Sequence, residues 1–167
     1  MPVLIRDAVE ADMEAVRSIY NATIPTTTVA WTEDLQTSEQ RLAWFATQQE
    51  RGFPVLVAEQ DGDVVGFAAY SDFRGAGRWP GYRYTVEHTI HVRERAWGLG
   101  VGRALLEELL ERARSQGMHV MVGGIDGANE SSLRFHERLG FVETARMPEV
   151  GIKFGRWLEL VFVQKIL

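Results

Sequence analysis

The sequence predicts an α+β fold in which one mixed sheet is covered by helices on both faces. Short apolar segments rich in β-branched residues alternate along the chain with segments whose apolar residues recur at helical spacing. Asp61-Gly62 stands between two such apolar segments and is the strongest short hairpin signal in the chain. With 167 residues, 46% of them hydrophobic, residues 1–167 can form one domain with its own core.

The first third of the chain is expected to contain a strand, two helices and the segment that joins them. Residues 3–6 form a short apolar strand, and a helix begins at Glu10 or Asp12 and ends near Asn21. The segment 23–31 is predicted to be extended, because most of its residues are β-branched and a proline interrupts it. Within them, Val29 and Trp31 either fill the core or form a wall of a substrate pocket. Ser38 then caps a second helix, which Gly52 closes.

The middle of the chain predicts two paired strands followed by a long loop and a central strand. Residues 54–59 and 64–70 flank the hairpin turn, and the central strand runs from 82 to 92. The loop between them, residues 73–81, is rich in glycine and arginine. Its arginines could bind a substrate carboxylate in bidentate fashion, although a solvated charged loop has the same composition.

The second half continues the alternation of helices and strands. A helix is expected over residues 102–115, a buried strand over 118–125, a turn over 126–129 and a short helix over 130–139. Strands over 141–147 and 157–167 complete the chain.

Composition and charge exclude several classes of function. The chain has 18 basic and 23 acidic side chains, a net charge of −5, and no basic run typical of proteins that bind nucleic acid. The absence of cysteine excludes disulfides, thiolate metal sites and a cysteine nucleophile, and is compatible with a cytoplasmic protein. We see no signal segment and no apolar run long enough to span a membrane. The four histidines lie on separate segments without metal-ligand spacing, so no metal is expected.

Three alternating glycines, Gly98, Gly100 and Gly102, separate the central strand from the leucine-rich helix that follows. Glycines let the backbone approach a ligand closely, and the first turn of a helix offers unpaired N–H groups to a phosphate or pyrophosphate. A P-loop is excluded because Arg103-Ala104 stands where Lys-Ser or Lys-Thr is required, and the spacing fits a dinucleotide fingerprint poorly. A connection that needs the glycines only for its geometry remains an alternative.

The arginine and glycines of Arg95-Ala-Trp-Gly98-Leu-Gly100 resemble the acyl-CoA motif of the GCN5-related N-acetyltransferases (GNAT family). A second segment, from Asn129 to Gly140-Phe141, is similar to the family's Asn-led helix that ends in Gly-Phe. Within the family, residues 86–88, 116–122 and 150–157 look like the phosphinothricin and methionine sulfoximine acetyltransferases. The resemblance covers nearly the whole chain and implies the GNAT fold, with a central mixed, mostly antiparallel sheet.

The resemblance also implies an activity. We expect acetyl-CoA as the acetyl donor and, as the acceptor, the amine of a small amino acid or analogue such as phosphinothricin, methionine sulfoximine or methionine sulfone. Transfer would be direct, in a ternary complex. The alternatives are acetylation of a protein N-terminus or another amine, and a CoA-binding sensor that has lost catalysis. A homodimer is implied as well, with residues 153–157 near the shared interface. We also expect the protein to be cytoplasmic.

Acyl transfer to an amine requires a base, donors for the thioester carbonyl and an acid for the leaving thiolate. By resemblance the base is Glu87, unless it pairs with Arg74 or Arg83, and the acid is His136, unless that histidine is structural. Residues implied to bind the cofactor are Ile90, His91, Val92, Arg95, Ala96, Trp97, Gly98, Leu99, Gly100, Val101, Gly102, Arg103, Asn129 and Ser131. Residues implied to bind the substrate are Val29, Trp31, Phe73, Arg74, Gly75, Arg83, Glu87, His88, Thr89 and Lys153.

The chain departs from the family pattern in two places. The turn between Val92 and Gly98 is about two residues shorter than in relatives, and the loop between Arg74 and Glu87 is longer. Trp97 also stands where relatives have a small or basic residue, and could cover the pyrophosphate or the loop beside it. We therefore expect the family resemblance to predict the use of the cofactor more reliably than the identity of the substrate.

Overall fold

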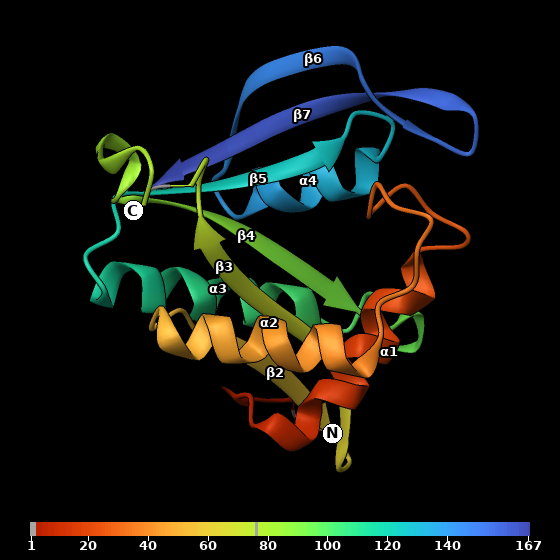
Figure 1. The fold of residues 1–167 in the computed structure, drawn as a ribbon, viewed down its shortest axis with the longest axis vertical. Helices are drawn as coiled ribbons and strands as arrows, with labels where there is room; N and C mark the ends of the chain where they lie inside the picture. The colour runs from red at the N-terminus through yellow and green to blue at the C-terminus, as the bar shows by residue number, and fades with distance from the viewer. Residues whose placement is uncertain (1–2, 76) are drawn as a thin grey trace.

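A computed structural model describes residues 3–75 and 77–167; Ala76, in the predicted loop, lies outside the described residues. These residues form a seven-stranded sheet in the order β1-β2-β3-β4-β5-β7-β6 (Figure 1). All neighbouring strands are antiparallel except β4 and β5, which are parallel. The predicted mixed, mostly antiparallel sheet is therefore confirmed. The strands are β1 Leu4–Asp7, β2 Val55–Gln60, β3 Asp63–Asp72, β4 Thr85–Val92, β5 Val120–Asp126, β6 Val142–Lys153 and β7 Arg156–Ile166.

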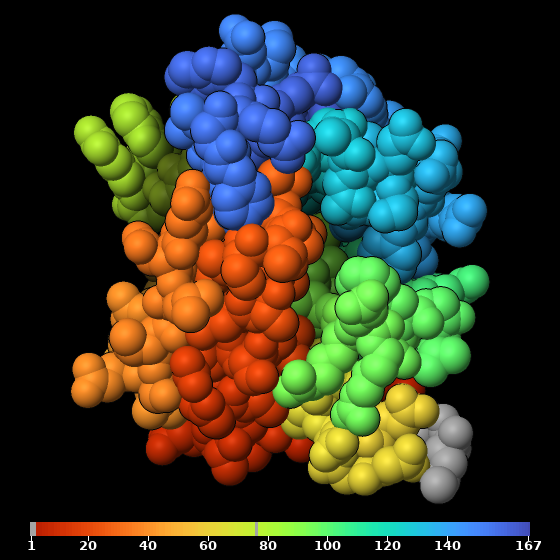
Figure 2. Space-filling view, turned by 90° about the vertical axis from the view of Figure 1, so that its right-hand side faces the viewer, coloured from red at the N-terminus to blue at the C-terminus, as the bar shows by residue number. Residues whose placement is uncertain are grey.

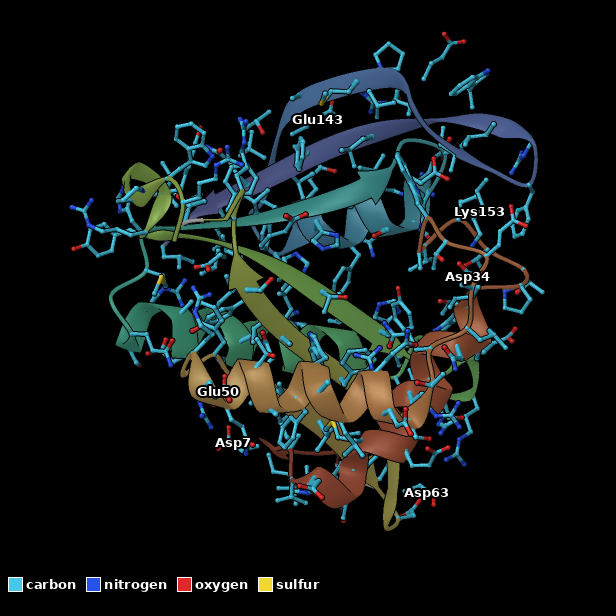
Figure 3. The ribbon with its side chains drawn as sticks, in the orientation of Figure 1. Asp7, Asp34, Glu50, Asp63, Glu143 and Lys153 are labelled. Carbon is cyan, nitrogen blue, oxygen red and sulfur yellow. The ribbon has the colours of Figure 1, made fainter. Side chains whose placement is uncertain are left out.

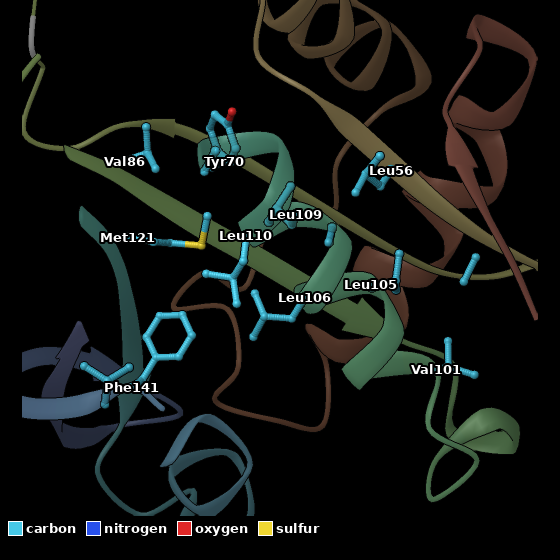
Figure 4. Packing of buried hydrophobic residues seen from close by; sticks show 14 of the residues in the cluster. Leu56, Tyr70, Val86, Val101, Leu105, Leu106, Leu109, Leu110, Met121 and Phe141 are labelled. Carbon is cyan, nitrogen blue, oxygen red and sulfur yellow. The ribbon is translucent and has the colours of Figure 1, made fainter. Parts of the chain in front are cut away.

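Helices cover both faces of the sheet, as the sequence predicts. Helices α1 (Met13–Thr23) and α2 (Ser38–Glu50) bury one face, whose core includes Phe67 on β3. On the other face, α3 (Val101–Ser115) presents four leucines to the sheet, and α4 (Glu130–Arg138) packs nearby (Figure 4). The described residues also contain three 3₁₀ turns: η1 Glu10–Asp12, η2 Pro80–Tyr82 and η3 Glu94–Ala96. No helix in the described ranges is both long enough and apolar enough to cross a membrane.

Four predicted boundaries are wrong, each for a local reason. Residues 23–31 are not extended, because α1 continues through Thr23 and turns and bends follow. Helix α2 is capped by Thr37, whose side chain accepts from the Gln40 N–H in a capping box, instead of by Ser38. The central strand begins at Thr85, because residues 80–82 form a 3₁₀ turn with proline at its start. Strand β6 runs on to residue 153, since two register shifts absorb its irregular residues.

Strands β4 and β5 separate along their length. Their parallel pairing covers only residues 85–87 of β4 against 120–122 of β5. Both strands continue beyond that pairing, to Val92 and Asp126 respectively, and diverge as they do so (Figure 1). The sheet is therefore split from one end at its centre, and the split exposes strand edges to any ligand placed between them.

Candidate active site

A cleft of about 980 Å³ lies at the split between β4 and β5. Figure 2 shows this face of the molecule hollowed between the loop that follows α1, the green segment after β4 and the cyan region of α4. Its walls bring together residues that are far apart in sequence. Of the predicted site residues, those that line it are Val29, Ile90, Val92, Ala96, Trp97, Gly98, Gly100, Val101, Gly102, Arg103, Asn129, Ser131 and His136.

The open edge of β4 supplies backbone donors to the cleft. The Arg93 N–H donates to Val65 O at 2.8 Å, and the Thr85 carbonyl accepts from Phe73 N at 3.3 Å, so odd-numbered residues of β4 bond toward β3. Backbone groups alternate in direction along a strand, so Ile90 and Val92 direct their N–H groups toward the split. Such N–H groups can bind a carbonyl oxygen on which negative charge develops.

The start of α3 has the geometry of an anion site. Gly98 and Gly100 adopt φ of +74° and +80°, a conformation that side chains other than glycine rarely adopt. Gly100 is the N-cap of α3, and the first-turn N–H groups that follow have no helical acceptor. Three arginines, Arg103, Arg138 and Arg156, also line the cleft. Unpaired amides, the positive end of the helix dipole and the arginines together fit a pyrophosphate-bearing ligand such as coenzyme A.

Glu87 lies at the apex of the split, in the last residue pair that joins β4 to β5. Burial raises the pKa of its carboxyl group. Among the described residues, neither candidate partner forms an ion pair with it: Arg74 stacks over Tyr82, and Arg83 stacks over Tyr84. Strand alternation places Glu87 on the face covered by α1 and α2, the same face as Asp126 at the end of β5. Glu87 is not among the residues that line the cleft, but its half-buried carboxylate, which has no ion pair among the described residues, can accept a proton.

His88 and His136 lie on the opposite face of the sheet from Glu87. Their rings stack with centroids 5.0 Å apart, and burial lowers the pKa of His88 to about 3. Burial also lowers the pKa of His136, whose Nδ1 lies 2.7 Å from the Ser132 carbonyl. A carbonyl only accepts, so Nδ1 carries the proton and the buried Nε2 has a lone pair. His136 is therefore neutral, and it must be protonated before it can donate a proton to a leaving group.

Three residues predicted to contact the cofactor lie outside the cleft lining. The His91 ring stacks on Phe67 at 5.1 Å, on the face opposite Ile90, and its Nε2 lies 3.1 Å from Thr89 Oγ1. The Arg95 side chain pairs with Asp63 at 2.8 Å, and Leu99 is exposed. Neither the His91 nor the Arg95 side chain is placed to bind a ligand in the cleft.

The residues predicted to bind the substrate divide into separate groups. Phe73, with Arg74 and Gly75 after it, belongs to the loop between β3 and β4, and its ring contacts Tyr82 and Phe162. Trp31 packs over Gly151. Lys153 is fully buried and donates to three backbone carbonyls. The structure does not gather these residues into one pocket within a single chain.

Sequence reasoning missed the threonines and the aspartate that line the cleft. Thr26, Thr27 and Thr28 form part of its wall, and the Thr28 hydroxyl donates to the Asp126 carboxylate. A run of three threonines in an apolar segment is the one signal that could have marked this wall. Among the described residues, no group of three or more histidine, aspartate or glutamate side chains is arranged to hold a metal ion.

The model of the acetyltransferase (GNAT) family matches residues 16–141. The chain belongs to the GNAT family. It is 46% identical over 160 residues to the L-methionine sulfoximine/L-methionine sulfone acetyltransferase of Salmonella typhimurium, covering 96% of this chain and 92% of that protein. This GNAT protein is thus an N-acetyltransferase, as the glycine and asparagine motifs predict.

Solved GNAT structures share the whole fold. A phosphinothricin acetyltransferase from Sinorhizobium meliloti, in complex with acetyl-CoA, superposes with a TM-score of 0.94 at 35% identity, covering 100% of this chain and 89% of that one. A ribosomal-protein-alanine N-acetyltransferase from Brucella melitensis gives 0.95 at 45% identity, covering 98% and 99%. The prediction of acetyl-CoA as the co-substrate of this GNAT protein is confirmed, and the cleft has the groups that would hold it.

Proposed function

We propose that this GNAT protein acetylates the amine of a small amino acid or analogue, such as methionine sulfoximine, methionine sulfone or phosphinothricin. One observation carries the proposal: the split between β4 and β5 begins at Glu87 and leads directly to backbone donors and the glycine-flanked start of α3. Donors for a carbonyl and an anion site thus meet at one cleft, and Glu87, outside the lining of the cleft, stands at the apex of the split that leads into it. The names of the S. typhimurium and S. meliloti relatives support the acceptor class.

Each group has a role in direct transfer. Acetyl-CoA supplies an activated acetyl thioester, which Gly98, Gly100 and the first turn of α3 would hold by its phosphates. The N–H groups of Ile90 and Val92 stabilise charge on the carbonyl oxygen. Glu87 takes the proton that the acceptor ammonium must lose, directly or through water, because its raised pKa makes it a stronger base than an ordinary carboxylate. Burial keeps His136 neutral, so His136, at the cleft wall, would have to take up a proton from solvent before it could pass one to the leaving thiolate.

The proposal extends to the organisation of the protein. Residues 1–167 act as a single acetyltransferase domain, since one sheet uses strands from both ends of the chain. Apolar residues exposed on the β6–β7 hairpin, among them Val150, Ile152 and Trp157, support a homodimer that covers this hairpin. Light scattering that finds only monomer would remove this part of the proposal. A cytoplasmic location is part of the same proposal.

A thiol-release assay with acetyl-CoA tests the acceptor class. The panel contains phosphinothricin, methionine sulfoximine, methionine sulfone, polyamines and short peptides, and each is run with wild type and Glu87→Gln. We expect turnover confined to the amino-acid analogues and greatly reduced in the variant. Turnover with peptides alone would instead support the second candidate, protein N-terminal acetylation, which the 45% identity to the B. melitensis protein favours. Binding of acetyl-CoA without any turnover would contradict both.

A further inference from the structure

The amine of Lys153 is enclosed by the backbone of a distant segment. Lys153 ends β6 and is 1% exposed, and its Nζ lies 2.7 Å from each of three carbonyl oxygens, those of Ile24, Thr27 and Ala30. Figure 3 shows Lys153 beside the loop that leaves α1. An ammonium group has three N–H donors, and these three carbonyls take all of them. The side chain has no donor left for a substrate, which differs from the role implied by the family resemblance.

The three carbonyls belong to a wall of the cleft. Residues 23–31, which we call the threonine wall, contribute Thr23, Thr26, Thr27, Thr28 and Val29 to the cleft lining. Beyond Thr23 this wall consists of turns and bends, without a strand or helix of its own. Such a segment keeps one shape only through the contacts that hold it in place. Carbonyls three residues apart converge on one cation, so Lys153 sets the curvature of the wall.

Further contacts attach the threonine wall to the elements on either side of it. The Trp31 ring lies directly on Gly151, where a methyl group would come within 2.2 Å of it. Glu33 accepts from the Phe154 N–H at 3.2 Å. On the opposite side, the Thr28 hydroxyl donates to Asp126 at the end of β5. The wall is thus fixed to the β6–β7 turn on one side and to the split strand on the other.

We propose that Lys153 is a positioning residue, which holds the threonine wall in place and thereby determines which acceptor amines fit the cleft. The inference rests on the proposed function, because the wall can select acceptors only if the cleft binds them. Without the cation, three carbonyls in a buried site would lack partners and turn toward water. The wall would then open, while the start of α3 and the edge of β4 would keep their geometry.

Hydrogen exchange in the full-length chain tests the anchoring without any substrate. Lys153→Met keeps the length of the side chain and removes its donors. We expect amide exchange in residues 23–31 to rise about tenfold or more, with exchange in α3 unchanged. Lys165→Met is the matched control: the Lys165 Nζ donates to the Leu139 carbonyl at 2.6 Å, away from the wall, so this variant should leave exchange in the wall unchanged. Unchanged exchange of the wall in Lys153→Met would overturn the proposal.

Kinetics separate anchoring from direct substrate binding. We expect Lys153→Met to raise KM for the acceptor about tenfold, with kcat and acetyl-CoA affinity within about threefold of wild type. Gly151→Ala should raise the same KM although Lys153 is intact, because the added methyl displaces Trp31. This second variant also tests the wall if Lys153→Met does not fold.

Two other results have separate meanings. If Lys153→Met abolishes acceptor binding while Gly151→Ala and exchange in the wall match wild type, Lys153 contacts the substrate and the proposal is wrong. Failure of the proposed function has a different signature, since wild type itself would then turn over none of the amino-acid analogues.

Discussion

Replacing His91 by phenylalanine tests how the buried face of β4 responds to acid. His91 is 7% exposed, and its ring stacks on Phe67. Burial, and secondarily the charge of Arg41, lower its pKa to about 4. The unfolded chain has the ordinary value of about 6.5, so between these two values the unfolded state binds the proton and the folded state does not. The contribution of His91 to the free energy of unfolding is therefore fully present above pH 6.5, and it is lost as the pH falls toward 4.

The magnitude follows from the two pKa values. At pH 5, histidine is almost fully protonated in the unfolded chain but only about one-tenth protonated in the folded one, and the linkage relation gives a loss of about 2 kcal/mol relative to pH 7.5. His91→Phe keeps the aromatic stack and cannot titrate. Its lost contact with Thr89 Oγ1 costs stability at both pH values and cancels in the comparison.

Urea unfolding of both proteins at pH 7.5 and pH 5.0 measures the difference. We expect wild type to lose about 2 kcal/mol more than His91→Phe over this interval, while other titrating groups contribute to both proteins alike. Equal losses in the two proteins would show that His91 does not resist protonation, and the reasoning from its burial would be refuted.

Three further predictions test the base, the anion site and the core. Glu87→Gln should lower kcat about 10²- to 10⁴-fold in the thiol-release assay. Glu87→Gln should also raise the unfolding temperature at pH 7, because it removes a charged carboxylate from a buried position. This gain should disappear as the pH falls through the raised pKa of Glu87, since the wild-type carboxyl group then becomes neutral. Gly100→Ala forces a side chain into φ +80° at a cost of about 1–2 kcal/mol, and calorimetry should show weaker acetyl-CoA binding. Gly117→Ala, at φ +74° beyond the other end of α3, should lose similar stability but no affinity; equal affinity losses would contradict the anion site. Leu109→Ala, at a fully buried position, should cost about 2–5 kcal/mol in urea unfolding, and a loss below about 1 kcal/mol would contradict the packing of α3.

The sequence by itself determined the features that depend on neighbouring residues. The β2–β3 hairpin follows from Asp61-Gly62 between two apolar runs, and α3 follows from leucines at helical spacing after the glycines. The anion site at the start of α3 was predictable for the same reason, since glycine conformation and unpaired helix N–H groups are local properties. The two-residue period of a strand also predicts that Glu87 and His88 lie on opposite faces of the sheet, although we assigned both residues to the substrate pocket.

The tertiary structure alone decided what depends on distant partners. Nothing within residues 85–92 shows that pairing with β5 stops at Glu87, because the divergence of two strands is set by the helices and strands packed around them. Nothing near Lys153 shows that its amine meets carbonyls more than 120 residues earlier in the chain. A charged side chain has the same sequence signature whether it binds a substrate or a backbone, and only the positions of its acceptors distinguish the two.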